Sequence, residues 1–181
     1  MAEPVYRPGT IKTYSGIYVD PLNMTVDDIR LGDIAHALAR MGRYNGHYPV
    51  FRSVGQHSLE VGTKAWRLTG DRKMARTALG HDFSEAYMGD MVNPMKRQPE
   101  MKTFVDREEE LQAVIAEAFD LYWPFPELIH ELDQENGEME RDLWNQGRTY
   151  ILGRENSAVV SLNVEATFRY FSKEATCTHQ Q

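Results

Sequence analysis

Apolar residues recur every three or four positions along most of the chain, which is the spacing of amphipathic helices. Strand-like alternation is nearly absent, and only the short segment 16–19 predicts a strand. No internal repeat or low-complexity stretch interrupts this pattern. The sequence therefore predicts an all-α fold.

Capping residues, glycines and prolines set the expected ends of six helices. Ser53 and Gln56 form a capping box, Gly89 is a stop signal, and Pro126 suits the first position of a helix. In chain order, with the residues that mark them, we expect a helix capped by Asp33 and ended by Gly42 (Ile34, Leu38, Met41), one after Ser53 (His57, Val61, Ala65, Leu68), one over about 73–88 (His81, Asp82, Glu85), a long one with an acidic outer face (Phe104, Glu108, Leu111, Ile115, Ala118), one from Pro126 (Leu128, Leu132, Met139, Leu143) and one over about 161–173 (Val164, Phe168, Phe171).

Length and composition narrow the class of protein. A chain of 181 residues can bury its own core, so we expect one domain over 1–181. Cys177 is the only cysteine, which excludes an intrachain disulfide and indicates a reducing cytoplasm. The beginning of the chain has no signal-peptide pattern and no apolar run approaches a membrane span, so we expect no membrane association. The net charge of -7 argues against a nucleic-acid partner.

Four separated residues are candidate metal ligands: His57, the adjacent pair His81 and Asp82, and Asp133. An imidazole or a carboxylate on an inward face is costly unless it is hydrogen-bonded or ligated. Taken singly, an inward histidine usually bonds a carbonyl group and an aspartate near a helix end usually caps it. Together, imidazole and carboxylate groups suit a divalent transition metal.

The segments around these residues resemble the HD-domain phosphohydrolases, and within them the YfbR-like 5'-deoxynucleotidases and their phage relatives. The resemblance rests on RYNGH (43–47), SVGQHS (53–58), HDFSEAYMGDMVNPMK (81–96) and HELDQE (130–135), so the motif-bearing core covers about 33–145. It implies a single helical HD-domain bundle with a buried site for one or more divalent ions such as Co²⁺, Zn²⁺ or Mn²⁺. The ligands that it implies are His57, His81, Asp82 and Asp133.

Two carboxylates are the candidate catalytic groups. Glu85 follows His81 by four residues and Asp82 by three, so it is expected on the same side of a helix as that pair. The HD-x-S-E pattern of the family supports Glu85 as a base or water-orienting group. By itself Asp90 is an ordinary loop residue after a helix stop; the resemblance makes it the candidate general acid, near the sugar and the leaving 5'-oxygen.

The resemblance also implies a substrate pocket. Arg43 is expected to contact phosphate, and Tyr44, which stands where the bacterial deoxynucleotidases have Trp, is expected to pack on the nucleoside and leaves base preference open. Lys96 is a second phosphate contact or a solvated lysine. His47 and His36 are pocket residues or lie just behind the pocket, and for His36 the alternative is an ordinary hydrogen-bonded helix residue. Glu140 lies seven residues after Asp133, and we expect it behind the ligands or in a salt bridge between helices.

The favoured function is a phage-type dATP triphosphohydrolase that releases deoxynucleoside and tripolyphosphate. The alternative within the family is a 5'-deoxynucleotidase acting on monophosphates, and both cleave the same 5'-O–P bond. Hydrolysis of guanosine alarmones matches the HDFSEA motif less well. A module that binds nucleotide or metal without turnover is the alternative from another class, although no expected ligand is missing here. We expect a homo-oligomer in the cytoplasm of a bacterium, or of the host cell if the chain is phage-encoded.

Overall fold

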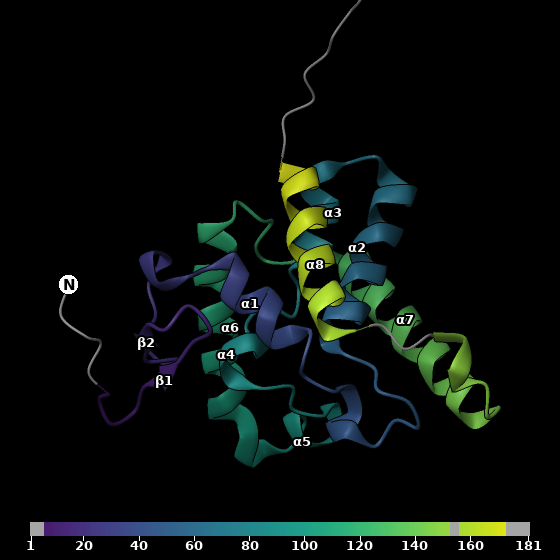
Figure 1. Cartoon of the computed structure of the whole chain (residues 1–181), viewed down its shortest axis with the longest axis horizontal. Helices are drawn as coiled ribbons and strands as arrows, with labels where there is room; N and C mark the ends of the chain where they lie inside the picture. Colours follow the sequence, from purple (N-terminus) through teal and green to yellow (C-terminus); the bar gives the residue numbers. More distant parts are fainter. Residues whose placement is uncertain (1–5, 153–155, 173–181) are drawn as a thin grey trace, which may run out of the picture.

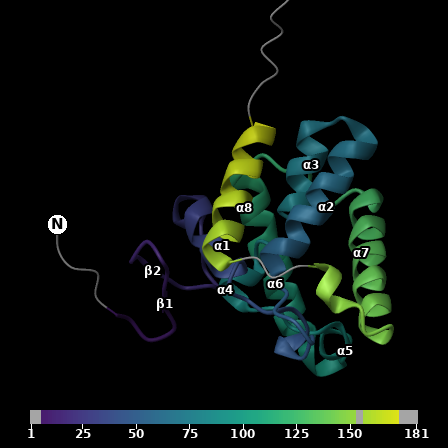
Figure 2. The same cartoon turned by 45° about the vertical axis from the view of Figure 1, so that its right-hand side comes forward.

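The structure, a computed structural model, describes residues 6–152 and 156–172 and consists of helices with one small hairpin (Figures 1 and 2). Its elements are β1 (Ile11–Lys12), β2 (Tyr18–Val19), α1 (Leu31–Leu38), α2 (Val54–Thr69), α3 (Arg72–Leu79), α4 (Glu85–Met88), α5 (Asn93–Lys96), α6 (Lys102–Ala118), α7 (Glu127–Asn145) and α8 (Ser157–Ser172), with 3-10 turns at Val26–Asp28, Arg43–Gly46, Pro99–Met101 and Thr149–Leu152. The mainly helical class is confirmed, and the strand expected at 16–19 is β2, paired antiparallel with β1. Each described helix is too short or too polar to cross a membrane.

The helices pack around two apolar clusters. α2 and α3 are joined through Gly70 and Asp71 and lie side by side, and α8 packs on both of them and on α1. The larger cluster draws on α1, α6 and α8, with Phe83 among its largest fully buried side chains. The smaller cluster joins Ile129 and Leu132 of α7 to α2 and α3. In both views α7 and the β1–β2 hairpin lie on opposite sides of the molecule (Figures 1 and 2).

Several expected local signals are confirmed. The Ser53 hydroxyl accepts a hydrogen bond from the Gln56 amide at 3.1 Å, and the Gln56 side chain accepts one from the Ser53 amide at 3.0 Å, so the capping box begins α2. Gly89 ends α4 with a φ of 90°. In α8, Val164, Phe168 and Phe171 are buried, although the helix begins earlier than expected, at Ser157. Residue 173, the expected end of this helix, lies outside the described residues.

Three expectations for the first two helices are wrong. Asp33 does not cap α1 but lies within it, 4% exposed, where its carboxylate accepts hydrogen bonds from the Ser15 amide at 2.6 Å and the Ser15 hydroxyl at 2.8 Å. Helix α1 ends at Leu38, before Gly42. Leu68 is 67% exposed, because the last turn of α2 extends beyond the core.

The continuous helix expected over 73–88 is interrupted. Helix α3 ends at Leu79 and α4 begins at Glu85, so His81 and Asp82 lie in the turn between two helices and not on a helix. The buried side chain of Gln112, on α6, donates to the Gly80 carbonyl at 3.0 Å and accepts from the Ser84 amide at 3.0 Å. The Gln112 amide thus satisfies the Ser84 amide and gives a second donor to the Gly80 carbonyl, which also accepts from the Phe83 amide at 3.2 Å.

The buried stripe of α7 also differs from the expected one. Its buried residues are Ile129, Leu132, Asn136, Gly137 and Glu140, whereas Leu128, Met139 and Leu143 are only partly buried. Pro126 precedes the helix and occupies the cap position. The side chains of Asn136 and Glu140 lie inward because they form hydrogen bonds with residues of other elements, which offset the cost of burying them. The segment 93–96, which lies outside the six expected helices, forms the short helix α5.

Candidate active site

A cavity of about 780 Å³ adjoins the break between α3 and α4. This volume lies in the range of sites that bind small molecules. The residues predicted for the site that line it are Arg43, Tyr44, His81, Asp82, Glu85, Asp90, Lys96 and Asp133. His57 is fully buried behind this wall. His47 does not line the cavity and its side chain is exposed, so the structure does not bring it to the site.

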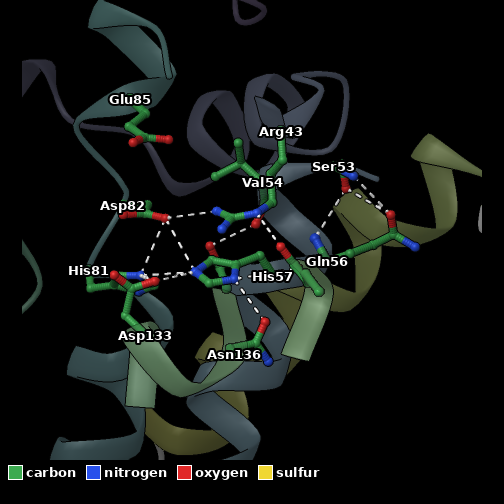
Figure 3. A network of polar contacts seen from close by, with 12 residues as sticks. Arg43, Ser53, Val54, Gln56, His57, His81, Asp82, Glu85, Asp133 and Asn136 are labelled. Carbon is green, nitrogen blue, oxygen red and sulfur yellow. Dashed lines mark hydrogen bonds and ion pairs between the residues drawn. The ribbon is translucent and has the colours of Figure 1, made fainter. Parts of the chain in front are cut away.

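The four candidate metal ligands converge. The ligand atoms of His57, His81 and Asp82 lie within 4.8 Å of one another, so this group could hold a metal ion. The two Nε2 atoms of the histidines are 3.3 Å apart, and Oδ1 of Asp133 lies 2.9 Å from Nε2 of His57 and 3.7 Å from Nε2 of His81. Figure 3 shows the two rings and the two carboxylates turned toward one another. α2, the α3–α4 turn and α7 each supply part of the group.

Hydrogen bonds behind the histidines fix which ring nitrogen faces the centre. The His57 Nδ1 atom lies 3.0 Å from Oδ1 of Asn136, and the Asn136 amide donates to Glu60 at 3.0 Å, which orients its oxygen toward the ring. The His81 Nδ1 atom lies 2.7 Å from the Ala78 carbonyl oxygen. Both histidines therefore donate through Nδ1 and present Nε2 to the centre, the arrangement that orients metal-binding imidazoles.

The electrostatics of this cluster favour a cation. Burial lowers the pKa of His81, but the carboxylates of Asp82 and Asp133 raise it, to about 9 overall. Burial raises the pKa of Asp133, but hydrogen bonds with His57 and His81 outweigh burial and hold that pKa well below its usual range. Two imidazole nitrogens and two carboxylates also form a donor set that divalent transition metals accept. The residues present therefore fit such an ion.

Glu85 begins α4 and its carboxyl group is buried near the cluster (Figure 3). Among the described residues its Oε2 atom has no hydrogen-bond partner, and its Oε1 atom lies 3.6 Å from the Lys96 ammonium group. Burial and the nearby carboxylates of Asp82 and Asp90 raise the pKa of Glu85 well above the usual value. The opposing effect of the Lys96 ammonium group is smaller than their combined effect. A buried oxygen without a partner that faces a cavity is suited to bind a water molecule or a ligand.

Asp90 lines the same cavity just beyond the end of α4. Burial raises the pKa of its carboxyl group; Asp82 raises it further, while Arg43 and Lys96 oppose the shift. Glu85 and Asp90 are thus two carboxyl groups with raised proton affinity on one cavity wall. This is the environment from which acid and base groups are drawn in enzymes.

Arg43 is held by a buried carboxylate. Its Nε atom donates to Oε2 of Glu140 at 2.9 Å, while its Nη1 atom lies 4.0 Å from Oδ2 of Asp82. Glu140, fully buried, also accepts from the Tyr44 hydroxyl at 2.9 Å and from Nε of Arg52 at 3.0 Å. Glu140 therefore forms salt bridges, but its arginine partners lie in the Arg43–Gly46 turn and just before α2, not on a facing helix as expected. The pairing leaves the terminal nitrogens of Arg43 directed toward the candidate metal centre.

Tyr44 contributes its ring to an aromatic cluster at the edge of the cavity. The ring stacks on Tyr48 at a centroid distance of 5.4 Å and meets Trp144 edge-on at 5.8 Å. Tyr44 and Asn45 have φ angles of 57° and 52°, a left-handed conformation that is unusual for residues other than glycine. The contacts with Glu140 and the aromatic cluster fix this turn.

Lys96 lines the cavity and is already paired there, whereas His36 lies elsewhere. The Lys96 ammonium group pairs with the Glu108 carboxylate at 2.7 Å, in addition to its approach to Glu85. His36 stacks on Tyr14 at 3.7 Å and lines a separate cavity of about 330 Å³ near the hairpin. His36 is therefore not at the candidate active site.

The structure adds residues that the sequence did not single out. Asn136 orients His57, and Gln112 holds the turn that carries His81 and Asp82. Arg97, His130 and Arg141 line the cavity and bring further positive or ionisable groups to it. For Arg141 one signal is present in the sequence, since Gly137 lies inside a helical segment four residues from both Asp133 and Arg141.

Comparison with known proteins finds no matching family model. The chain is 39% identical over 114 residues to the uncharacterized protein YfdR of Escherichia coli strain K12. The aligned segment covers 61% of this chain and 58% of that protein. It is 37% identical over 112 residues to the uncharacterized protein RCAP_rcc00048 of Rhodobacter capsulatus, covering 59% of this chain and 56% of that protein. The matched segment thus spans a little over half the length of each relative.

Proposed function

We propose that this chain is a metal-dependent phosphohydrolase of the HD type that cleaves the 5'-O–P bond of 2'-deoxynucleotides. The observation that carries the proposal is the convergence of His57, His81, Asp82 and Asp133 at a 780 Å³ cavity, beside the buried carboxyl group of Glu85. Co²⁺, Zn²⁺ and Mn²⁺ all suit this donor set. When bound, such an ion supplies Lewis acidity toward a phosphoryl oxygen and lowers the pKa of a water molecule.

The side chains of the cavity account for the proton transfers. Glu85 orients the attacking water through its unpartnered Oε2 atom and accepts a proton from it, since its raised pKa makes the carboxylate a stronger base than an ordinary glutamate. The bond from the water oxygen to the α-phosphorus forms as the bond from phosphorus to the 5'-oxygen breaks. Asp90, whose pKa is also raised, donates a proton to the leaving 5'-oxygen. Arg43 stabilises charge on the phosphoryl oxygens through its terminal nitrogens.

The resemblance to the phage branch and the volume of the cavity favour a deoxynucleoside triphosphate, with dATP the first candidate. Its products are deoxynucleoside and tripolyphosphate. The Arg43–Tyr44 turn, which contacts with Glu140 hold in position, packs against the sugar in this proposal and leaves no partner for a 2'-hydroxyl group. A buried hydroxyl group without a partner costs roughly 1–3 kcal/mol, so ATP should be at least about tenfold poorer than dATP.

The test is turnover of a panel of nucleotides by the full chain with Co²⁺, Zn²⁺ or Mn²⁺, followed by chromatographic separation of phosphate from tripolyphosphate. We expect tripolyphosphate from dATP, and the Asp82→Ala variant as the inactive control. Phosphate from dAMP with no tripolyphosphate from dATP would favour the 5'-deoxynucleotidase alternative. Metal-loaded protein that hydrolyses no deoxynucleotide would reject the proposal.

A further inference from the structure

Two cations at the main cavity are already paired with buried or half-buried carboxylates. Arg43 is committed through Nε to Glu140 at 2.9 Å, and Lys96 is committed to Glu108 at 2.7 Å. The terminal nitrogens of Arg43 point to the candidate metal centre, where the α-phosphate would react. A longer phosphate chain therefore needs further positive groups beyond these two, in a protein whose net charge is -7.

Arg97 and Arg141 meet this requirement. Both line the cavity, Arg97 directly after α5 and Arg141 on α7. Both side chains are exposed, and neither forms an ion pair within 6–152 and 156–172. Guanidinium groups without a carboxylate partner can bind phosphate oxygens through two parallel hydrogen bonds.

Gly137 shows how Arg141 reaches toward the centre. A Cβ atom placed on Gly137 would lie 3.3 Å from Nη1 of Arg141 and would have no other neighbour within 4 Å. The guanidinium group thus lies over Gly137, back along α7 toward Asp133. Asp133, Gly137 and Arg141 follow one another at intervals of four residues, so they share one face of the helix.

The spacing along this face matches a phosphate chain that starts at the candidate metal centre. Four residues of helix rise about 6 Å, so the guanidinium group over Gly137 lies roughly one turn from the position of Asp133. A glycine in a helix interior is unfavourable by about 1 kcal/mol relative to alanine. The space left by the missing side chain is occupied by the arginine and by nothing else nearby.

We propose that Arg141, lying over Gly137, and Arg97 form a subsite for the phosphates beyond the α-phosphate. This inference rests on the proposed function and deepens it, because it assigns a polyphosphate chain as the part of the substrate that the subsite recognises. A nucleoside monophosphate held at the metal centre ends before this subsite and gains nothing from it.

The main test compares KM for dATP and dAMP in the parent chain and in Arg141→Gln. Losing a charge-assisted hydrogen bond weakens binding about tenfold or more, so we expect KM for dATP to rise at least about tenfold. KM for dAMP should change less than about twofold. Arg148→Gln is the matched control, because it removes the same charge from an exposed arginine outside the cavity. An unchanged ratio of the two KM values in Arg141→Gln would overturn the inference.

Gly137→Ala provides a second variant with opposite effects on stability and binding. The added methyl group favours the helix and should raise the melting temperature, yet it crowds Nη1 of Arg141 and should raise KM for dATP a few-fold. A merely structural role for Gly137 would not weaken dATP binding in a more stable protein. If Gly137→Ala leaves the dATP KM unchanged while Arg141→Gln also does so, Arg141 does not bind the substrate.

Calorimetric binding of inorganic tripolyphosphate and inorganic phosphate separates this inference from the proposed activity. With the divalent metal in excess over both anions, tripolyphosphate should bind the parent chain more tightly than phosphate, and Arg141→Gln should remove most of the difference. This outcome supports the subsite even if no deoxynucleotide is turned over. Equal binding of the two anions by the parent chain would overturn the subsite, even if dAMP proved to be hydrolysed.

Discussion

Replacing Glu140 by alanine should be among the most destabilising changes in this chain. Its carboxylate is fully buried and accepts hydrogen bonds from Nε of Arg52 at 3.0 Å, Nε of Arg43 at 2.9 Å and the Tyr44 hydroxyl at 2.9 Å. The arginine side chains are themselves 1% and 13% exposed, for Arg52 and Arg43 respectively. The substitution therefore removes one anion from between two largely buried cations.

The expected loss in the free energy of unfolding depends on which ion-pair partners each arginine keeps after the substitution. Removing one member of a buried ion pair typically costs 3–5 kcal/mol, because the other charge is left uncompensated. Arg52 keeps its ion pair with Glu60, whereas Arg43 keeps only the 4.0 Å approach to Asp82. We therefore expect a loss of about 3–5 kcal/mol in the free energy of unfolding, and not the larger sum of three separate charge-assisted hydrogen bonds.

Urea denaturation at neutral pH measures this loss directly. Glu140→Gln should cost less than Glu140→Ala, since an amide oxygen still accepts a hydrogen bond while its NH₂ group faces the other donor. Glu138→Ala on the exposed side of α7 is the matched control and should stay within about 0.5 kcal/mol of the parent. A Glu140→Ala variant within about 1 kcal/mol of the parent would refute the idea that this carboxylate holds the Arg43 turn to α7.

Three further changes test the site and its support. His81→Ala should remove the bound divalent metal and with it turnover, as metal analysis of the purified variant would measure; full metal occupancy would contradict the proposed centre. Glu85→Gln should keep the metal and bind nucleotide but lose about 10²–10⁴-fold in kcat, and normal turnover would require another base. Gln112→Leu leaves the Ser84 amide without a partner, whereas the Gly80 carbonyl keeps its hydrogen bond from the Phe83 amide, so we expect about 1–3 kcal/mol lower stability by urea denaturation; an unchanged midpoint would show that water replaces the Gln112 side chain.

The sequence predicted the parts of the fold that depend on neighbouring residues. The Ser53–Gln56 capping box and the inward face of α8 are local patterns, and the structure contains both. The break after α3 could not be predicted in this way. The residues over 73–88 have a helical pattern, and the side chain that compensates for the break, Gln112, comes from a helix much later in the chain.

The error in α7 has a similar physical cause. Hydrophobicity ranks Leu128 and Met139 as inward residues, and for Glu140 the sequence left open a place behind the ligands or a salt bridge between helices. Burial of Glu140 becomes favourable only because Arg43 and Arg52 converge on it from a distant part of the chain. The charge of such a residue is visible in the sequence, but its partners are not.

The candidate site was predicted more completely than the packing around it. The resemblance located four residues whose ligand atoms do converge, and the cavity contains most of the other residues that it implied. Arg97 was missed because a single arginine without a motif looks the same in the sequence whether it faces solvent or a cavity, and the Gly137 spacing that marks Arg141 has a meaning only once the cavity is known. His47 was included because a histidine after the arginine motif matched the phage relatives, but its side chain lies away from the cavity.

The polar stripe of α7 also determines how that helix can align with its neighbours. Two apolar helix faces can slide past each other by a turn and still bury similar areas. In α7 a shift of one turn would separate Asn136 from His57 and Glu140 from its two arginines, leaving buried polar groups without partners. Misaligned docking is therefore heavily penalised, and the one alignment that satisfies these groups also places Asp133 beside the two histidines.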